Sequence, residues 1–105
     1  AEADTANIFC VKDGAVLTPF ATACLHGITR DTVLNLSREA GHITEERQLS
    51  LIDFYAADEV FVTGTVCELV PVVNIDGRDI GSGEPGPVWA DLLSRYRAHV
   101  RGHIV

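Results

Sequence analysis

Short apolar blocks separated by turn residues open the chain, a pattern typical of paired strands rather than of a helix. Residues 7–11 are mostly apolar, Lys12-Asp13-Gly14 has turn chemistry, and residues 15–18 follow before Pro19 stops the second block. The Asp-Gly pair supplies the positive φ that a tight reversal needs. The sequence therefore predicts a β-hairpin here.

Helical spacing replaces this pattern after the hairpin. Thr29 is predicted to cap a helix whose first turn contains Asp31 and whose end is marked by Gly41. One face of this helix carries the apolar stripe Val33, Leu34, Leu36 and Ala40.

A second long helix is predicted near the carboxyl end. It starts at Pro87, which suits a first helical position, runs to about Arg101 and ends at Gly102. Its apolar face comprises Val88, Leu92, Tyr96 and Val100.

Shorter elements fill the space between the two helices. Residues 43–49 predict a strand, and Ser50 to Asp53 form a capping box for a short helix to about Ala57. Residues 57–71 predict two strands around a Gly64-Thr65 break; the second strand continues to residue 75, turns at 76–77 and returns over 78–80, before a loop at 81–86. Mixed strands and helices without a repeat or linker predict one α+β unit.

The Gly64-Thr65 break is the polar kink between two apolar strands. A glycine in a strand pattern marks a bulge or a close backbone approach, and the threonine adds a hydroxyl and an N–H group. These groups can bind an anion, although a plain corner between strands explains this stretch better when it is taken alone. The segment His26-Gly27-Ile28-Thr29 offers similar groups at a helix start, which favours an anion site.

Composition limits the classes of partner. The chain has 105 residues, of which 47% are hydrophobic, enough for one core. A formal net charge of −7 with eight Lys and Arg argues against a nucleic-acid surface. No apolar run approaches the roughly 20 residues of a membrane span, and the acidic start lacks the basic region of a signal peptide. We expect a cytoplasmic protein that binds neither nucleic acid nor membrane.

Cysteine and methionine usage adds two expectations. Cys10, Cys24 and Cys67 are odd in number and form no Cys-x-x-Cys pair, so we expect reduced, packed thiols and no metal site. Cys67 has no cationic neighbour in sequence to activate it as a nucleophile. The chain has no Met, which suggests a piece of a longer polypeptide.

Five segments in register resemble one family. They are EADTANIF at 2–9, GITRD at 27–31, ADEVF at 57–61, GT at 64–65 and GEPGP at 83–87. Over essentially its whole length the chain resembles the fold-type IV, or class IV, pyridoxal-phosphate aminotransferases, and most of all the branched-chain-amino-acid aminotransferases. The resemblance implies part of the large C-terminal domain of the D-amino-acid-aminotransferase-like fold, with mixed strands, short hairpins and two main helices.

The resemblance implies pyridoxal 5'-phosphate as the cofactor. Glu2 would be the carboxylate that meets the protonated pyridine nitrogen, so that the ring can act as an electron sink. The N–H groups of Ile28 and Thr29, with the Thr65 hydroxyl, would hold the phosphate, in agreement with the anion-binding groups noted above. Without the other motifs, Glu2 would be interpreted as a solvated acid at a chain end.

Further residues match the family's site one by one. Gly27 and Gly64 would let the backbone approach the cofactor closely. Leu25 matches an apolar residue that packs against the cofactor ring, although a core leucine explains it nearly as well. The backbone of Thr65 and Val66 matches the turn that binds the substrate α-carboxylate.

Two small residues follow Gly-Thr in many branched-chain members, whereas this chain has Val66 and Cys67. The added bulk beside the substrate carboxylate leaves the exact amino acid open. The acidic residues Asp58, Glu59 and Glu68 are more typical of solvated or strand-end charges, and no acid–base role is assigned to them.

The Schiff-base lysine of the family precedes the motif that begins with Glu2, so no catalytic residue is predicted within this chain. Lys12, the only lysine, lies in the hairpin turn on the other side of that motif. We therefore expect residues 1–105 to be the C-terminal portion of the large domain, without the N-terminal domain and the lysine segment. The chain alone is predicted to be inactive.

The function implied is transfer of the amino group of a branched-chain L-amino acid, such as leucine, isoleucine or valine, to 2-oxoglutarate by a full-length homo-oligomer, a dimer or larger. D-amino-acid aminotransferase and aminodeoxychorismate lyase are alternatives with the same fold. A noncatalytic fragment that binds a small molecule is the alternative of another class.

Overall fold

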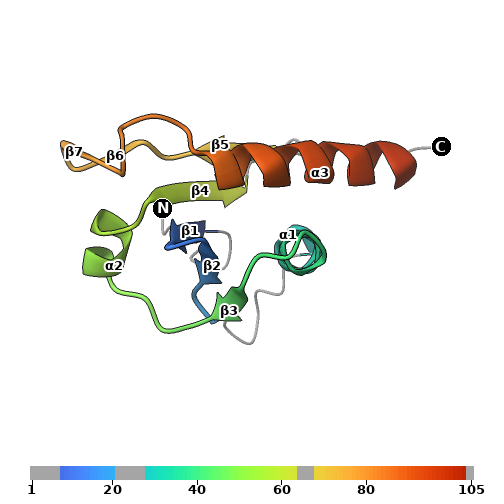
Figure 1. Ribbon diagram of the computed structural model, residues 1–105, viewed down its shortest axis with the longest axis horizontal. Coiled ribbons are helices and arrows are strands. Elements are labelled where there is room, and N and C mark those ends of the chain that lie inside the picture. The colour runs from blue at the N-terminus through green and yellow to red at the C-terminus, as the bar shows by residue number, and fades with distance from the viewer. Residues whose placement is uncertain (1–7, 21–27, 64–67, 104–105) are drawn as a thin grey trace.

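The computed structural model describes residues 8–20, 28–63 and 68–103, and its elements are shown in Figure 1. In chain order they are β1 (Ile8–Lys12), β2 (Ala15–Thr18), α1 (Ile28–Glu39), β3 (Thr44–Glu46), α2 (Leu51–Tyr55), β4 (Glu59–Thr63), β5 (Leu69–Pro71), β6 (Asn74–Ile75), β7 (Arg78–Asp79) and α3 (Pro87–His103).

Five of these strands form one sheet in the order β3-β2-β1-β4-β5. β1 pairs antiparallel with β2 and with β4, and β4 pairs antiparallel with β5. The β2–β3 pair is parallel. The alternation of strands, hairpins and two long helices confirms the α+β class, with α1 and α3 as the main helices.

The first predicted hairpin is confirmed. β1 and β2 are joined by a turn in which Asp13 has φ 51° and Gly14 has φ 82°. Positive φ at both central residues is the backbone of a type I′ turn, whose twist matches that of the flanking strands. The Asp-Gly dipeptide therefore specifies this reversal locally.

Both faces of the sheet are covered, because alternate strand residues point to opposite sides. Phe9 and Phe61 lie on one face and stack with their ring centroids 5.2 Å apart. This face packs against α1 and α3 through Val33, Leu34, Leu92 and Tyr96. The other face carries Cys10, Leu17 and Val60, and Ile80, Phe54 of α2 and Ile75 of β6 belong to the cluster that covers it.

Helix α1 ends as the sequence predicts and begins earlier. Gly41 has φ 90°, and the N–H groups of Gly41 and His42 donate to the carbonyls of Arg38 and Ser37, which is a Schellman motif. The prediction that Thr29 caps the helix is wrong, because the helix already includes Ile28. Thr29 is the second residue of the helix and lies inside its first turn.

Helix α2 and its neighbours are shorter than predicted. Ser50 caps α2, and its N–H donates to Asp53 Oδ2 at 2.7 Å, but the helix stops at Tyr55. The strand expected over 43–49 covers only Thr44–Glu46. β5 does not continue to residue 75; it ends at Pro71, and β6 pairs with β7 as a separate hairpin whose turn has φ 53° at Asp76.

Helix α3 starts at Pro87, as predicted, and its face of Val88, Leu92, Tyr96 and Val100 joins the core. The prediction that Gly102 ends the helix is wrong, because α3 runs through Gly102 to His103. Glycine weakens a helix by only about 1 kcal/mol relative to alanine, so a single glycine does not compel a stop. Figure 1 shows α3 beginning beside β4 and β5 and extending past them, with α1 viewed end-on below it.

Candidate active site at one end of the sheet

Three chain segments that carry the predicted cofactor motifs meet the sheet at the same end. Residues 1–7 lead into Ile8 at the start of β1, which pairs with Val62 near the end of β4. The segment 64–67 connects the end of β4 to the start of β5, where Thr63 pairs with Leu69. The segment 21–27 follows the end of β2, which is antiparallel to β1. The described residues that flank the three motifs therefore lie at one end of the sheet: Ile8, the end of β2, Thr63 and Leu69.

Side chains bind this edge together. The Thr18 hydroxyl at the end of β2 donates to the carbonyl of Ile8 at 2.7 Å, and Thr18 is fully buried. Arg30 of α1 donates through Nη2 to the Pro19 carbonyl at 2.9 Å and to Glu46 Oε2 at 2.6 Å. Since Glu46 pairs with Thr18, both acceptors lie at this end. The start of α1 is thus attached to the end of the sheet at which Ile8, Thr18 and Glu46 lie.

Of the predicted site residues, the structure describes Ile28 and Thr29. They are the first two residues of α1, and the Ile28 side chain is exposed. The first N–H groups of an α-helix have no partner within the helix and carry the positive end of its dipole. The other predicted residues lie outside the described part of the chain: Glu2, Leu25, Gly27, Gly64, Thr65 and Val66.

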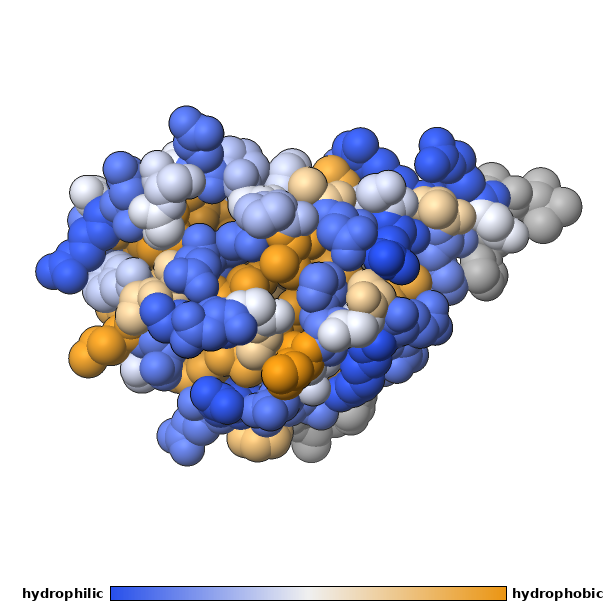
Figure 2. Space-filling model, in the orientation of Figure 1, coloured by the Kyte–Doolittle hydropathy of each residue, from blue (hydrophilic) through white to orange (hydrophobic). Residues whose placement is uncertain are grey.

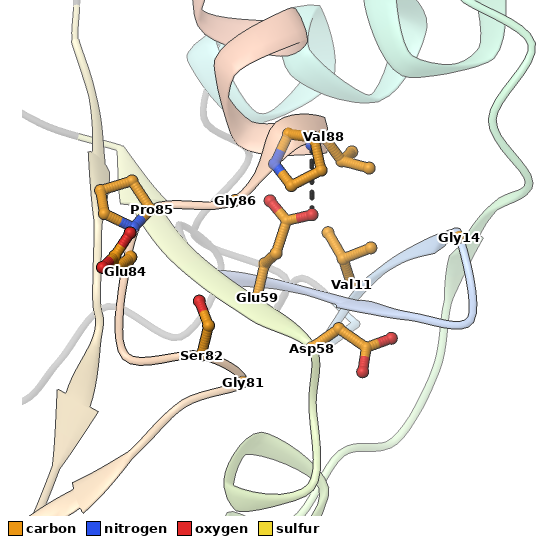
Figure 3. Close-up of a pocket in the computed structure, with 11 residues that line it drawn as sticks. Val11, Gly14, Asp58, Glu59, Gly81, Ser82, Glu84, Pro85, Gly86 and Val88 are labelled. Atoms are coloured by element: carbon orange, nitrogen blue, oxygen red, sulfur yellow. Dashed lines mark hydrogen bonds between the residues drawn. The ribbon is translucent and has the colours of Figure 1, made fainter.

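A hollow lies at the opposite end of the sheet, beside the Asp13-Gly14 turn and the loop before α3 (Figure 3). Glu59 borders this hollow and is buried. Its carboxylate accepts the N–H groups of Val88 and Trp89 at 3.1 and 2.8 Å, which caps the first turn of α3. Each oxygen of Glu59 thus accepts a hydrogen bond. Glu59 therefore acts as a helix cap beside the hollow rather than as an acid–base group.

The other reactive groups near that end are held by structural contacts. Lys12 Nζ donates to the Ala56 carbonyl at 3.0 Å. It lies next to the hairpin turn, at the end of β1 opposite Ile8. Burial, followed by the nearby Asp53 carboxylate, raises the pKa of the Cys10 thiol to about 11. A protonated, buried thiol is a poor nucleophile, which agrees with a packing role.

Metal-ligand groups and membrane-spanning helices are both absent from the described residues. His99 and His103 stand four residues apart on α3, a spacing that suits a metal ion, yet no group of three or more His, Cys, Asp and Glu in the described ranges could hold one. No helix in the described part of the chain is both long and apolar enough to span a bilayer.

The amino-transferase class IV family model matches residues 1–75. The chain therefore belongs to the class IV aminotransferase family. Among curated relatives it is 53% identical over 96 residues to branched-chain-amino-acid aminotransferase-like protein 1 of Arabidopsis thaliana, covering 91% of this chain and 17% of the relative. It is 46% identical over 102 residues to the branched-chain-amino-acid aminotransferase of Pseudomonas aeruginosa, covering 97% of this chain and 33% of that protein.

Solved structures agree with the fold. The chain superposes with a TM-score of 0.81 and 42% identity on the branched-chain amino acid aminotransferase from Escherichia coli, over 88% of this chain and 32% of that one. The holo branched-chain amino acid aminotransferase of Thermobaculum terrenum, solved in its PLP form, gives a TM-score of 0.84 at 41% identity, over 91% and 32%. The chain thus spans about a third or less of the relatives that it matches.

Two buried charged residues are not identified by sequence reasoning. In the sequence Arg30 is only one letter of the GITRD motif and Glu59 has no assigned chemistry, yet each makes two side-chain hydrogen bonds to distant parts of the chain. Glu59 is the first residue of a buried strand, a position where a charge needs a partner, and that is the available signal. Arg30 beside a helix start has no such signal.

Proposed function

We propose that this chain is part of a pyridoxal-phosphate-dependent aminotransferase that passes the amino group of branched-chain L-amino acids to 2-oxoglutarate. The observation that carries the proposal is that the strand ends next to the three motif segments lie at one end of the sheet. The start of α1 is attached to the same end. The alignments with the two curated relatives, which cover more than 90% of this chain, support branched-chain amino acids as the substrate class. Leucine, isoleucine and valine are the donors to test first.

The donor set at the start of α1 suits the phosphate of the cofactor. α1 is twelve residues long, so its amino end carries the positive end of a helix dipole and N–H groups that have no partner within the helix. We propose that Ile28 and Thr29 supply these N–H groups and that Thr65 adds its hydroxyl. Gly27 and Gly64 would keep the approach free of Cβ atoms.

The remaining proposed residues orient the ring and the substrate. Glu2 would hold a proton on the pyridine nitrogen, and Leu25 would pack against the ring face. The backbone of Thr65 and Val66 would bind the substrate α-carboxylate. Bound pyridoxal phosphate would supply an electron sink for a substrate that loses its Cα proton.

We also propose that residues 1–105 form the C-terminal portion of the large domain of a longer polypeptide. The short share of each relative that the chain covers supports this. The reactive lysine would then come from the preceding segment, and this chain alone would be inactive. Incubation of the isolated chain with pyridoxal phosphate, followed by borohydride reduction, should label Lys12 and the terminal amine only sparsely. A stoichiometric Lys12 adduct together with turnover would refute the proposal that the reactive lysine lies in the preceding segment.

The substrate test uses the complete polypeptide that carries this chain. L-leucine with 2-oxoglutarate should yield L-glutamate, and D-alanine should not replace L-leucine. Turnover with D-alanine would indicate the D-amino-acid enzyme, and pyruvate release from aminodeoxychorismate without a 2-oxo acid would indicate the lyase. Cofactor binding without any of these reactions would support the noncatalytic alternative.

We further propose a cytoplasmic homo-oligomer, a dimer or larger. The free, buried thiol of Cys10 suits a reducing compartment. Several large apolar side chains are exposed on the described surface, namely Phe20, Ile28, Ile43 and Ile52. Figure 2 shows apolar side chains reaching the surface within a mainly polar face. Light scattering of the complete protein at two concentrations would test the oligomer.

A further inference from the structure

Arg30 is buried to a degree that arginine seldom reaches. Its relative exposure is 2%, although it lies in the first turn of a helix at the edge of the molecule. Arginine is almost never fully buried unless it is paired. The position of Arg30, directly after Ile28 and Thr29, makes its partners relevant to the cofactor edge.

The Arg30 guanidinium joins three elements. Nη2 donates to the carbonyl of Pro19, which follows β2, and to the carboxylate of Glu46 at the end of β3. Nη1 lies 3.6 Å from Asp31 Oδ1 on the same helix. The first turn of α1 is therefore held against the ends of two neighbouring strands by one planar side chain.

Stability alone is a poor explanation for this arginine. Its buried Nε has no hydrogen-bond partner within the described part of the chain. A buried donor without a partner costs free energy, and water screens the attraction between Arg30 and Glu46, whose side chain is 39% exposed. An apolar residue would cover the core at this position but could not fix the helix start to both strand ends.

We infer that Arg30 is a positioning residue for the cofactor phosphate, an inference that rests on the proposed function. Arg30 fixes the N–H groups of Ile28 and Thr29 beside Pro19 and Glu46, at the end of the sheet where β1 begins and β4 finishes. Its charge is balanced by Glu46 at 2.6 Å, so the effect comes from geometry more than from long-range attraction. Lysine at this position would keep the charge but lose the planar fork.

The test compares two ligands that differ only in the phosphate. Arg30→Lys in the complete enzyme should weaken binding of pyridoxal phosphate about tenfold, the size of one lost charged hydrogen bond, while the affinity for pyridoxal stays as in the parent. Absorbance titration gives both dissociation constants. Arg38→Lys is the matched control, because Arg38 is exposed near the other end of α1 and should change neither constant.

A second variant covers the case in which Arg30→Lys does not fold. Glu46→Ala removes one of the two anchors from a partly exposed position and should weaken pyridoxal phosphate selectively, by a smaller factor. Glu45→Ala, at the neighbouring exposed position of β3, is its control. Equal losses for pyridoxal and pyridoxal phosphate, or no loss for either, would overturn the inference. A parent enzyme that binds neither ligand would overturn the proposed function, and the inference with it.

Discussion

Removing the Glu59 carboxylate should loosen the amino end of α3. Glu59 lies on β4, is 8% exposed, and accepts the N–H groups of Val88 and Trp89. Glu59→Ala would leave two half-buried donors without a protein partner. The loss of a helix cap costs about 0.5–2 kcal/mol, and a hydrogen bond to a charged group contributes about 1.5–3 kcal/mol. Because water can reach these donors in part, we expect a total of about 2–4 kcal/mol.

Hydrogen exchange measures this effect where it occurs. In the complete protein, a peptide that covers the first turns of α3 should exchange faster in Glu59→Ala than in the parent, whereas a peptide from α1 should not change. Glu59→Gln keeps one acceptor oxygen and should show a smaller increase. Glu84→Ala is the control, since Glu84 is exposed in the loop before α3.

Two results would contradict the capping interpretation. Unchanged exchange at Val88 and Trp89 in Glu59→Ala would mean that water replaces the carboxylate at no cost. An equal increase in Glu84→Ala would mean that any lost negative charge near the helix start has the same effect, so that the direct hydrogen bonds would carry no special weight.

Three further predictions follow from the proposed site and the core. Glu2→Ala in the complete enzyme should fold but lose most of its kcat, because an unprotonated pyridine is a poor electron sink; parental turnover would make Glu2 a surface acid. Thr65→Val should weaken cofactor affinity roughly 10- to 150-fold, while KM for the amino acid stays near parental at saturating cofactor, and an unchanged affinity would leave Gly64-Thr65 as a corner. The Cys10 pKa, raised to about 11 from 9.0, predicts slow alkylation of the folded protein at pH 8 and rapid alkylation once it is unfolded. The stability that this neutral thiol confers should be complete below pH 9 and should fall as the pH rises toward 11, as urea titrations would show.

Local chemistry explains which elements could be predicted from the sequence. The turns at Asp13-Gly14 and Asp76-Gly77 need positive φ, which these dipeptides supply without outside help. The end of α1 at Gly41 and the start of α3 at Pro87 are equally local signals. The short apolar run through Phe9, Cys10 and Val11 predicts a strand, although it does not say which partners cover each face.

What the sequence could not predict depends on contacts between distant residues. Arg30 reaches Glu46 across 16 positions and Glu59 reaches Trp89 across 30, and neither pairing leaves a spacing signal. The break between β5 and β6 is also a tertiary effect, because the partner of the chain changes there. The Val72 N–H still donates to the Val60 carbonyl beside β4, whereas the Val73 carbonyl accepts the Ile80 N–H beside the β6–β7 hairpin. The site motifs are recognisable through their joint order along the chain, not through any one of them.

The parallel pairing of β2 with β3 determines which way α1 points. Between two adjacent parallel strands, the chain must cross from the carboxyl end of the first strand back to the sheet end where both strands begin. Here that crossover contains α1. The helix must therefore begin where β2 finishes, as in α/β proteins whose ligands lie beyond the carboxyl ends of parallel strands. The path of the chain between β2 and β3 sets the direction of α1, and no single side chain does. A variant that loses Arg30 or Thr29 should therefore keep the direction of the α1 dipole, because only a different path of the chain between β2 and β3 would change it.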